Sequence, residues 1–191
     1  MKINSLIKIS PSILIILSFL VLIFLGASAL YLKSSTFKSI SFIDALFTAT
    51  SAVCVTGLST VDTPTTFNHQ GRLILIILMQ LGGLGVLTIT SFIIVVFTKN
   101  RHYLNFKAID ETLTQGLEFD FRKFIIRLFK FVFIIEFIGA LFLFFKFSQS
   151  YDLLNAIELS IFHSISAFCN AGFSLFSNSL ENYYNDWYLL S

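Results

Sequence analysis

Residues 51–60 read "SAVCVTGLST" and lie between two long apolar runs. The apolar segment that leads into them, residues 42–55, is too short to cross a bilayer and is typical of a re-entrant or interfacial segment. Irregular backbone at membrane depth is tolerated only where it is buried in protein or lines a water-filled path. The stretch therefore has two interpretations, a loop that lines a pore or an extracellular amphipathic turn with an ordinary glycine.

A helix start signal precedes this stretch. Ser41 is a good N-cap residue and Asp44 follows at the capping-box spacing, which predicts a helix from Phe42 to about Val53. A half-helix that points its C-terminus into the membrane presents the negative end of its dipole there, which favours a cation. An extended strand beyond it exposes carbonyl oxygens that replace a cation's water shell, and Gly57 permits the backbone angles this requires.

The composition is that of an integral membrane protein. Of 191 residues, 55% are hydrophobic and 13% charged, whereas a soluble domain carries about 25% charged residues. A net charge of +2 without a long basic run does not fit nucleic-acid binding. The sequence contains no catalytic triad or metal-ligand cluster, so we expect neither an enzyme nor a cofactor. Cys54 and Cys169 lie in apolar stretches and are expected to be small buried residues.

Three apolar runs are long enough to cross the membrane. Pro11–Leu32 and Leu73–Phe97 contain no charged residue, and Ile125–Phe145 carries two cations near its start and Glu136 inside. The first run also resembles a signal peptide with "ASA" at 27–29 as the cleavage site, but its length favours a span. A charge at mid-bilayer costs about 3 kcal/mol, so Glu136 is expected to face protein or water, as a structural partner or on an ion path.

Basic residues predict that the N-terminus, residues 1–10, and the linker 98–123 are cytoplasmic. Seven basic residues lie in these segments, against three between the first two spans. The seven are Lys2, Lys8, Lys99, Arg101, Lys107, Arg122 and Lys123, and the three are Lys33, Lys38 and Arg72. Within the linker, "FKAIDETLTQGL" predicts a short interfacial or cytosolic helix.

An internal repeat favours the pore loop over the turn. A shift of 115 residues places "FTATSAVCVTGLS", 47–59, over "FHSISAFCNAGFS", 162–174, with six of thirteen positions identical. The identical pairs are Phe47/Phe162, Ser51/Ser166, Ala52/Ala167, Cys54/Cys169, Gly57/Gly172 and Ser59/Ser174. Each copy follows an apolar span, so each has the order span, half-helix and glycine loop.

Two further features have structural interpretations. "GGLG" at 82–85 lies inside an apolar run without a preceding strand, which predicts close helix packing rather than a nucleotide loop. His163 lies opposite Thr48 in the repeat and is expected to pack within the second half-helix rather than bind a metal. His69 is isolated and is expected at the solvated surface.

Three motifs occur in order along the chain: "DALFTATSAVCVTGLSTVDT" at 44–63, "QLGGLGVLTITSF" at 80–92 and "FHSISAFCNAGFSLFSNSL" at 162–180. They resemble the Trk/Ktr/HKT superfamily of potassium transporters, and within it the Ktr-type membrane subunit of bacteria. The resemblance covers nearly the whole chain. It implies an all-α integral membrane fold of four repeated units, each with a span, a pore helix, a filter loop and a second span, around one potassium pore.

The resemblance also implies site residues. The first filter strand is Val55-Thr56-Gly57-Leu58 and the second is Asn170-Ala171-Gly172-Phe173, with backbone carbonyls as the main potassium ligands. Ser41 and Asp44 start the first pore helix. The resemblance further implies a multi-pass protein of the bacterial plasma membrane, a homodimer of the full-length subunit, and a cytosolic nucleotide-binding regulatory ring beside the basic linker. Sodium is left open as a coupling ion.

The chain is shorter than the resemblance requires. Four copies at this spacing need about 460 residues, so this sequence is expected to hold one and three-quarter copies, a first repeat at 11–97 and an incomplete second repeat at 124–191. The last span of the second copy and two filter strands are missing. We expect a fragment or a truncated reading frame rather than a pore assembled from several such chains.

Other functions stay open from the sequence alone. A sodium-permeable transporter of the HKT type has the same architecture, and a non-conducting membrane remnant or interaction protein fits the missing copies. A secondary transporter with broken helices also uses half-helices, but it needs polar substrate contacts inside the spans, where this sequence offers few.

Overall fold

The computed structural model describes residues 11–97 and 121–183, and every regular element in them is helical. The elements are α1 (Pro11–Tyr31), α2 (Phe42–Val53), α3 (Thr63–Thr66), α4 (His69–Phe97), α6 (Phe121–Phe147), α7 (Leu153–Phe168) and the 3-10 helix η1 (Glu181–Tyr183). The predicted all-α fold is therefore confirmed for these residues. The helix predicted within the linker lies outside the described residues.

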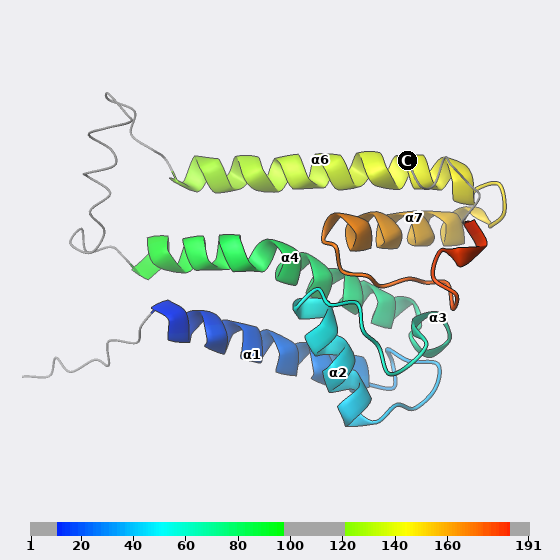
Figure 1. The fold of residues 1–191 in the computed structure, drawn as a ribbon, viewed down its shortest axis with the longest axis horizontal. Helices are drawn as coiled ribbons and strands as arrows, with labels where there is room; N and C mark the ends of the chain where they lie inside the picture. Colours follow the sequence, from blue (N-terminus) through cyan, green and yellow to red (C-terminus); the bar gives the residue numbers. More distant parts are fainter. Residues whose placement is uncertain (1–10, 98–120, 184–191) are drawn as a thin grey trace, which may run out of the picture.

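Three long helices set the shape of the molecule. Figure 1 shows α1, α4 and α6 lying along its long axis and alternating in direction. The shorter α2 packs against α1 and α4, and the shorter α7 packs against α6 and contacts α4. Both short helices end beside the middle of α4 (Figure 1). The helix α4 is therefore the element that both short helices share.

The helices α4 and α6 begin earlier than the apolar runs predicted. The helix α4 starts at His69 rather than Leu73, and α6 starts at Phe121 rather than Ile125. The last three residues of the predicted linker 98–123 consequently belong to α6. Basic residues lie between each helix start and its apolar run, and a helix can continue through such residues because long basic side chains can reach out of an apolar layer.

Asn68 explains where α4 starts. Its side-chain oxygen accepts hydrogen bonds from the backbone N–H groups of Gln70 at 2.9 Å and Gly71 at 3.1 Å. These two N–H groups have no partner within the helix, and an asparagine at the N-cap satisfies them. The start signal was present in the sequence, one turn before the uncharged run.

The outer faces of the helices are apolar. The segment Ile126–Phe147 of α6, 22 residues long, is apolar enough to cross a membrane by itself, and shorter apolar helices cover Ile16–Tyr31, Phe42–Val53 and Leu153–Phe168. Large apolar side chains on α1 and α6 are exposed, among them Leu25 at 65% and Phe137 at 69%. Soluble monomers rarely expose apolar faces of this extent, so the faces agree with the membrane class predicted from composition.

The helix α2 occupies the residues predicted for the half-helix, and its inner face is made of small residues. Ala45, Ala49 and Ala52 are fully buried. Because their side chains are short, the backbone of α2 can approach α1 and α4 closely.

The predicted capping box at the start of α2 is present. The Asp44 N–H donates to Ser41 Oγ at 3.1 Å, and the Ser41 N–H donates to the Asp44 carboxylate at 3.3 Å. Thr60 also donates to this carboxylate, at 2.8 Å. The hydrogen bonds from Ser41 and Thr60 hold the pKa of Asp44 below its ordinary value of 3.8. The stabilisation is therefore complete above that value and is lost as the pH falls through the lowered pKa.

The C-terminal ends of α2 and α7 are built alike. Each helix is followed by a residue with left-handed backbone, Val55 with φ 52° and Asn170 with φ 54°. Each end closes with the six-residue hydrogen bond of a Schellman motif. These bonds join Thr56 N–H to Ser51 O at 3.0 Å and Ala171 N–H to Ser166 O at 2.7 Å. Asparagine tolerates this conformation, whereas a β-branched residue is strained in it, and the strain at Val55 was not predicted.

Two adjacent glycines of α4 pack against the C-terminal ends of α2 and α7. A Cβ atom on Gly82 would lie 2.1 Å from the carbonyl oxygen of Val53, and one on Gly83 would lie 2.8 Å from Cys169 Sγ. A real Cβ atom at either position would force a neighbour to move, the backbone of α2 at position 82 and the Cys169 side chain at position 83, so glycine lets α4 come this close to both helices. The packing interpretation of "GGLG" at 82–85 is confirmed for these two glycines.

We expect Ser41→Ala to lower the free energy of unfolding by about 1 kcal/mol, because it removes the N-cap acceptor of α2. Thermal unfolding of the detergent-purified protein measures the change. Ser28→Ala is the matched control, since the Ser28 hydroxyl donates to the Phe24 carbonyl of its own helix and caps nothing. Equal losses of stability in the two variants would contradict the capping role.

We expect Gly82→Ala to cost about 3 kcal/mol or more, and Gly83→Ala about 1 kcal/mol. The new methyl group at position 82 meets the backbone of α2, which cannot move without shifting the whole helix end. The methyl group at position 83 meets the side chain of Cys169, which can rotate. The same unfolding measurement ranks the two variants, and the opposite ranking would refute the backbone contact.

Candidate functional site

The two segments predicted as filter strands meet at the ends of α2 and α7. A Cβ atom on Gly57 would lie 2.9 Å from both the carbonyl oxygen of Ala171 and the Cα atom of Gly172. A Cβ atom on Gly172 would lie 3.0 Å from the Cα atom of Gly57. Residues 115 positions apart in the sequence thus touch through their backbones, with no room for a side chain on either glycine.

Backbone conformation gives a second reason why positions 57 and 172 are occupied by glycine. Gly57 has φ 74° and Gly172 has φ 71°, both in the left-handed region that glycine adopts freely. Because Val55 and Asn170 are also left-handed, positive φ angles occur at alternate residues of each strand. Such alternation turns successive peptide groups to the same side, so their carbonyls can line one side of a strand.

The two strands differ in exposure. In the first strand the Thr56 side chain is exposed and Leu58 is 62% exposed. In the second strand Asn170 is exposed, but Ala171 and Phe173 are buried. The second and fourth residues of the first strand therefore form an open flank, whereas the residues at the same positions of the second strand are buried.

An open hollow of about 350 Å³ lies along this flank. Its lining comes from α2 and the first strand: Ile43, Leu46, Phe47, Thr50, Ser51, Thr56 and Leu58. Most of these side chains are apolar. A cation needs several oxygen ligands, so the hollow itself is a packing surface and not an ion site.

Aligned serines of the two half-helices hold the two strands. Thr56 Oγ1 donates to Ser51 Oγ at 2.9 Å, and Ser166 Oγ donates to the carbonyl oxygen of Phe173 at 2.7 Å. The second bond directs the Phe173 carbonyl toward α7. The carbonyls of residues 170–172 are thereby better candidates for ion ligands than that of Phe173, which the sequence reasoning had included.

Glu136 faces protein, as expected for a carboxyl group inside a span. It is 4% exposed, and its Oε2 accepts a hydrogen bond from Gln80 Nε2 of α4 at 2.9 Å. Its Oε1 has no hydrogen-bond partner within the described residues. The Cys169 thiol lies 3.7 Å from the Gln80 side-chain oxygen, so Glu136, Gln80 and the cap of α7 form one polar chain. Gln80 is therefore a structural partner for Glu136, as one of the two interpretations of this residue expected.

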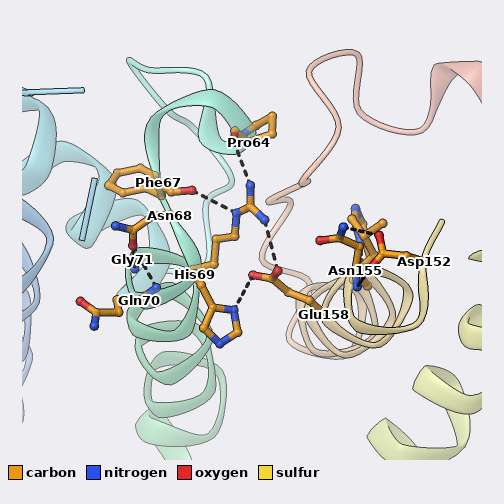
Figure 2. Close-up of polar contacts among 12 residues, drawn as sticks. Pro64, Phe67, Asn68, His69, Gln70, Gly71, Asp152, Asn155 and Glu158 are labelled. Carbon is orange, nitrogen blue, oxygen red and sulfur yellow. Dashed lines mark hydrogen bonds and ion pairs between the residues drawn. The ribbon is translucent and has the colours of Figure 1, made fainter. Parts of the chain in front are cut away.

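A polar cluster joins the start of α4 to α7, as Figure 2 shows. Arg72 pairs with Glu158 Oε2 at 3.3 Å and donates to the carbonyls of Pro64 and Phe67, each at 3.0 Å. His69 Nδ1 lies 3.2 Å from Glu158 Oε1, close enough for an ion pair when the ring is protonated, although the two atoms are not aligned for a hydrogen bond. His69 is exposed as expected, but the cluster was missed because its members lie far apart in the sequence.

The two cysteines are free, and the expectation that both are buried is half wrong. Cys169 is buried against Gly83 and Gln80 of α4, whereas Cys54 is exposed. The described residues contain no group of three or more His, Cys, Asp or Glu side chains arranged to hold a metal ion.

Comparison with known proteins places this geometry in a family context. The chain matches the TrkH family, described as "Cation transport protein", over residues 8–191. It is 37% identical over 173 residues to the Ktr system potassium uptake protein B of Vibrio alginolyticus, covering 91% of this chain and 38% of that protein. It is 39% identical over 175 residues to the potassium/sodium uptake protein NtpJ of Enterococcus hirae, covering 91% and 39%.

A third relative gives the same result. The Ktr system potassium uptake protein B of Bacillus subtilis is 37% identical over 185 residues, which cover 97% of this chain and 42% of that protein. The chain thus spans about two fifths of the length of these relatives. A family match over almost the whole chain shows that it belongs to the TrkH family of cation transport proteins.

Proposed function

We propose that this chain is the N-terminal part of a potassium uptake subunit of the Ktr type. Residues 55–57 and 170–172 form two walls of a carbonyl-lined selectivity filter, flanked by Leu58 and Phe173. The contact between Gly57 and Gly172 at the ends of two half-helices is the observation that carries this proposal. The remaining walls come from the part of the pore that corresponds to the rest of the relatives' length.

The mechanism rests on the two helix ends. A potassium ion loses water as it enters the filter, and backbone carbonyls of the two strands take the place of that water. The C-terminal ends of α2 and α7 add negative partial charge, which stabilises the cation without a fixed carboxylate. A neutral site of this kind lets the ion leave again, which conduction requires.

Selectivity between potassium and sodium depends on how well the carbonyls keep their positions. The Ser51 and Ser166 contacts fix the strands to their own half-helices, and the glycines of α4 fix the half-helices to each other. Both sets of contacts support a filter whose width is set by the packed helices.

The same proposal covers topology and partners. The span, half-helix, loop and span of 11–97 form the first repeat, and 124–191 form part of the second. Residues 1–10 and the basic linker face the cytoplasm of a bacterial cell, where the linker contacts a nucleotide-binding regulatory ring. The full-length subunit forms a homodimer in the plasma membrane.

A second candidate function is sodium-permeable transport. The relative in Enterococcus hirae is named a potassium/sodium uptake protein, and it is as similar to this chain as the potassium uptake proteins are. Backbone carbonyl ligands do not by themselves exclude sodium. Competition between the two ions in the assay described next separates the two candidates.

We expect Gly57→Ala and Gly172→Ala each to reduce potassium-over-sodium selectivity about tenfold or more. A side chain there is strained at positive φ by about 1–3 kcal/mol, and 1.4 kcal/mol corresponds to a factor of ten. Potassium uptake with sodium as competitor, in a strain that needs a potassium transporter and expresses the native reading frame, measures the ratio. Gly26→Ala is the control, because Gly26 has no positive φ and the nearest atoms to its methyl group belong to the side chain of Leu78 rather than to a filter strand.

Normal selectivity in both filter variants would refute the filter assignment. Equal uptake of the two ions by the unmodified protein would favour the sodium-permeable alternative.

The chain of residues 1–191 by itself, reconstituted in liposomes, is expected to carry no measurable potassium flux. The two strands supply only two walls of the proposed filter, so an ion between them lacks most of its carbonyl ligands. A flux assay with a potassium-selective electrode checks this, with the native reading frame as the positive control. Selective flux through the short chain would mean that several copies complete the pore together.

A further inference from the structure

The ring of His163 is buried within α7 and hydrogen-bonded at both nitrogens. It is 6% exposed, and its Nδ1 lies 2.8 Å from the carbonyl oxygen of Leu159. A carbonyl only accepts, so Nδ1 carries the proton. Nε2 lies 3.3 Å from the backbone nitrogen of Leu175, whose N–H only donates, so Nε2 is the acceptor. These two partners select one neutral tautomer.

Aromatic rings hold the imidazole in this orientation. Phe176 stacks on it with ring centroids 4.9 Å apart and an angle of 24° between the planes. Phe147 of α6 and Phe162 of α7 lie with centroids 5.8 Å away. A ring packed on several sides cannot swing away from its partners without disturbing them.

The partners of His163 Nε2 belong to the segment that leaves the second filter strand. Ser174 Oγ lies 3.2 Å from Nε2 and accepts the N–H of Phe176 at 3.0 Å. Together with the Ser166 bond to the Phe173 carbonyl, residues 173–175 are hydrogen-bonded to side chains of α7 at successive positions. The strand that ends at Gly172 is therefore held at both ends, by the helix cap before it and by His163 after it.

Within residues 11–97 and 121–183, no histidine supports the first strand as His163 supports the second. Thr48 occupies the aligned position, and its hydroxyl donates to the Asp44 carbonyl inside its own helix at 2.8 Å. The residues after Gly57 are instead held from the start of α2, where Thr60 donates to Asp44 at 2.8 Å. The two strands thus depend on different side chains for the same geometric task.

We propose that His163 is a positioning residue for selectivity, which accepts the Leu175 N–H and so fixes the carbonyls of residues 170–172 from behind. This inference rests on the proposed function, because it assigns a support to one wall of that filter. The ion does not touch His163. The residue acts through the backbone of residues 173–175, and it acts on the second strand alone.

Two substitutions distinguish the role of the Nε2 acceptor from the role of the aromatic ring of His163. The amide of His163→Gln reaches the position of Nε2, so it keeps an acceptor for the Leu175 N–H. The amide of His163→Asn reaches only the position of Nδ1 and leaves that buried N–H unpaired. An unpaired buried donor is costly enough to alter an equilibrium about tenfold. His69→Asn is the matched control, because the side chain of His69 is 76% exposed and lies beside Glu158, in the half of α7 that is distant in sequence from the second strand.

The assay is potassium uptake with sodium as competitor, using the native reading frame and normalising to the amount of protein in the membrane. We expect His163→Asn to lower the potassium-over-sodium ratio about tenfold, whereas His163→Gln and His69→Asn stay within about twofold of the unmodified protein. Gly172→Ala runs in parallel. If Gly172→Ala loses selectivity and His163→Asn keeps it, the inference fails and the filter stands. If Gly172→Ala keeps it, the proposed function fails.

The glutamine variant protects the test against a folding defect. Should His163→Asn be absent from the membrane, His163→Gln decides alone. A normal ratio with glutamine supports the acceptor role, whereas a tenfold loss with normal abundance shows that a side-chain acceptor is not what the segment needs.

Discussion

The close approach of α4 to the ends of α2 and α7 is the constraint on which the remaining geometry depends. A helix end leaves carbonyl groups without partners, and these ends are normally kept apart by side chains. Gly82 and Gly83 remove that separation at two successive positions. Because both half-helices stop at the same point on α4, their following strands meet at Gly57 and Gly172. Helix packing, rather than loop length, sets how far apart the two strands lie.

Polar contacts along α4 hold α6 and α7 in register with α4. Arg72 joins the start of α4 to α7, and Gln80 joins its middle to Glu136 of α6. Partly buried ion pairs stabilise a structure only when their other hydrogen bonds are satisfied. Arg72 meets that condition through two backbone carbonyls, whereas Glu158 Oε1 has no hydrogen-bond partner among the described residues, so the pair orients α4 against α7 mainly through its arginine.

The sequence predicted local features well and long-range contacts poorly. The capping box of Ser41 and Asp44, the length of α2 and the packing role of the paired glycines each depend on neighbouring residues, so pattern and spacing contain them. The helices α4 and α6 start four residues before the predicted apolar runs, because helices extend through basic residues that hydropathy does not count. The left-handed Val55 was not foreseen, because a valine gives no signal for positive φ.

The contacts that support the second strand could not be predicted from the sequence either. His163 was expected only to pack, because the residues next to it in the sequence do not indicate that the Leu175 N–H lies at its Nε2 atom. Contacts that link Arg72 to Glu158 across 86 residues need the fold itself.

The ends of α2 and α7 are alike in backbone geometry but differ in the accessibility of their cysteine thiols. Cys54 and Cys169 occupy the same C-cap position, yet one is open and the other is enclosed by α4. A thiol-directed reagent applied to the native chain therefore attaches at one helix end alone, so a fluorophore or spin label reports on the first strand without any engineered residue.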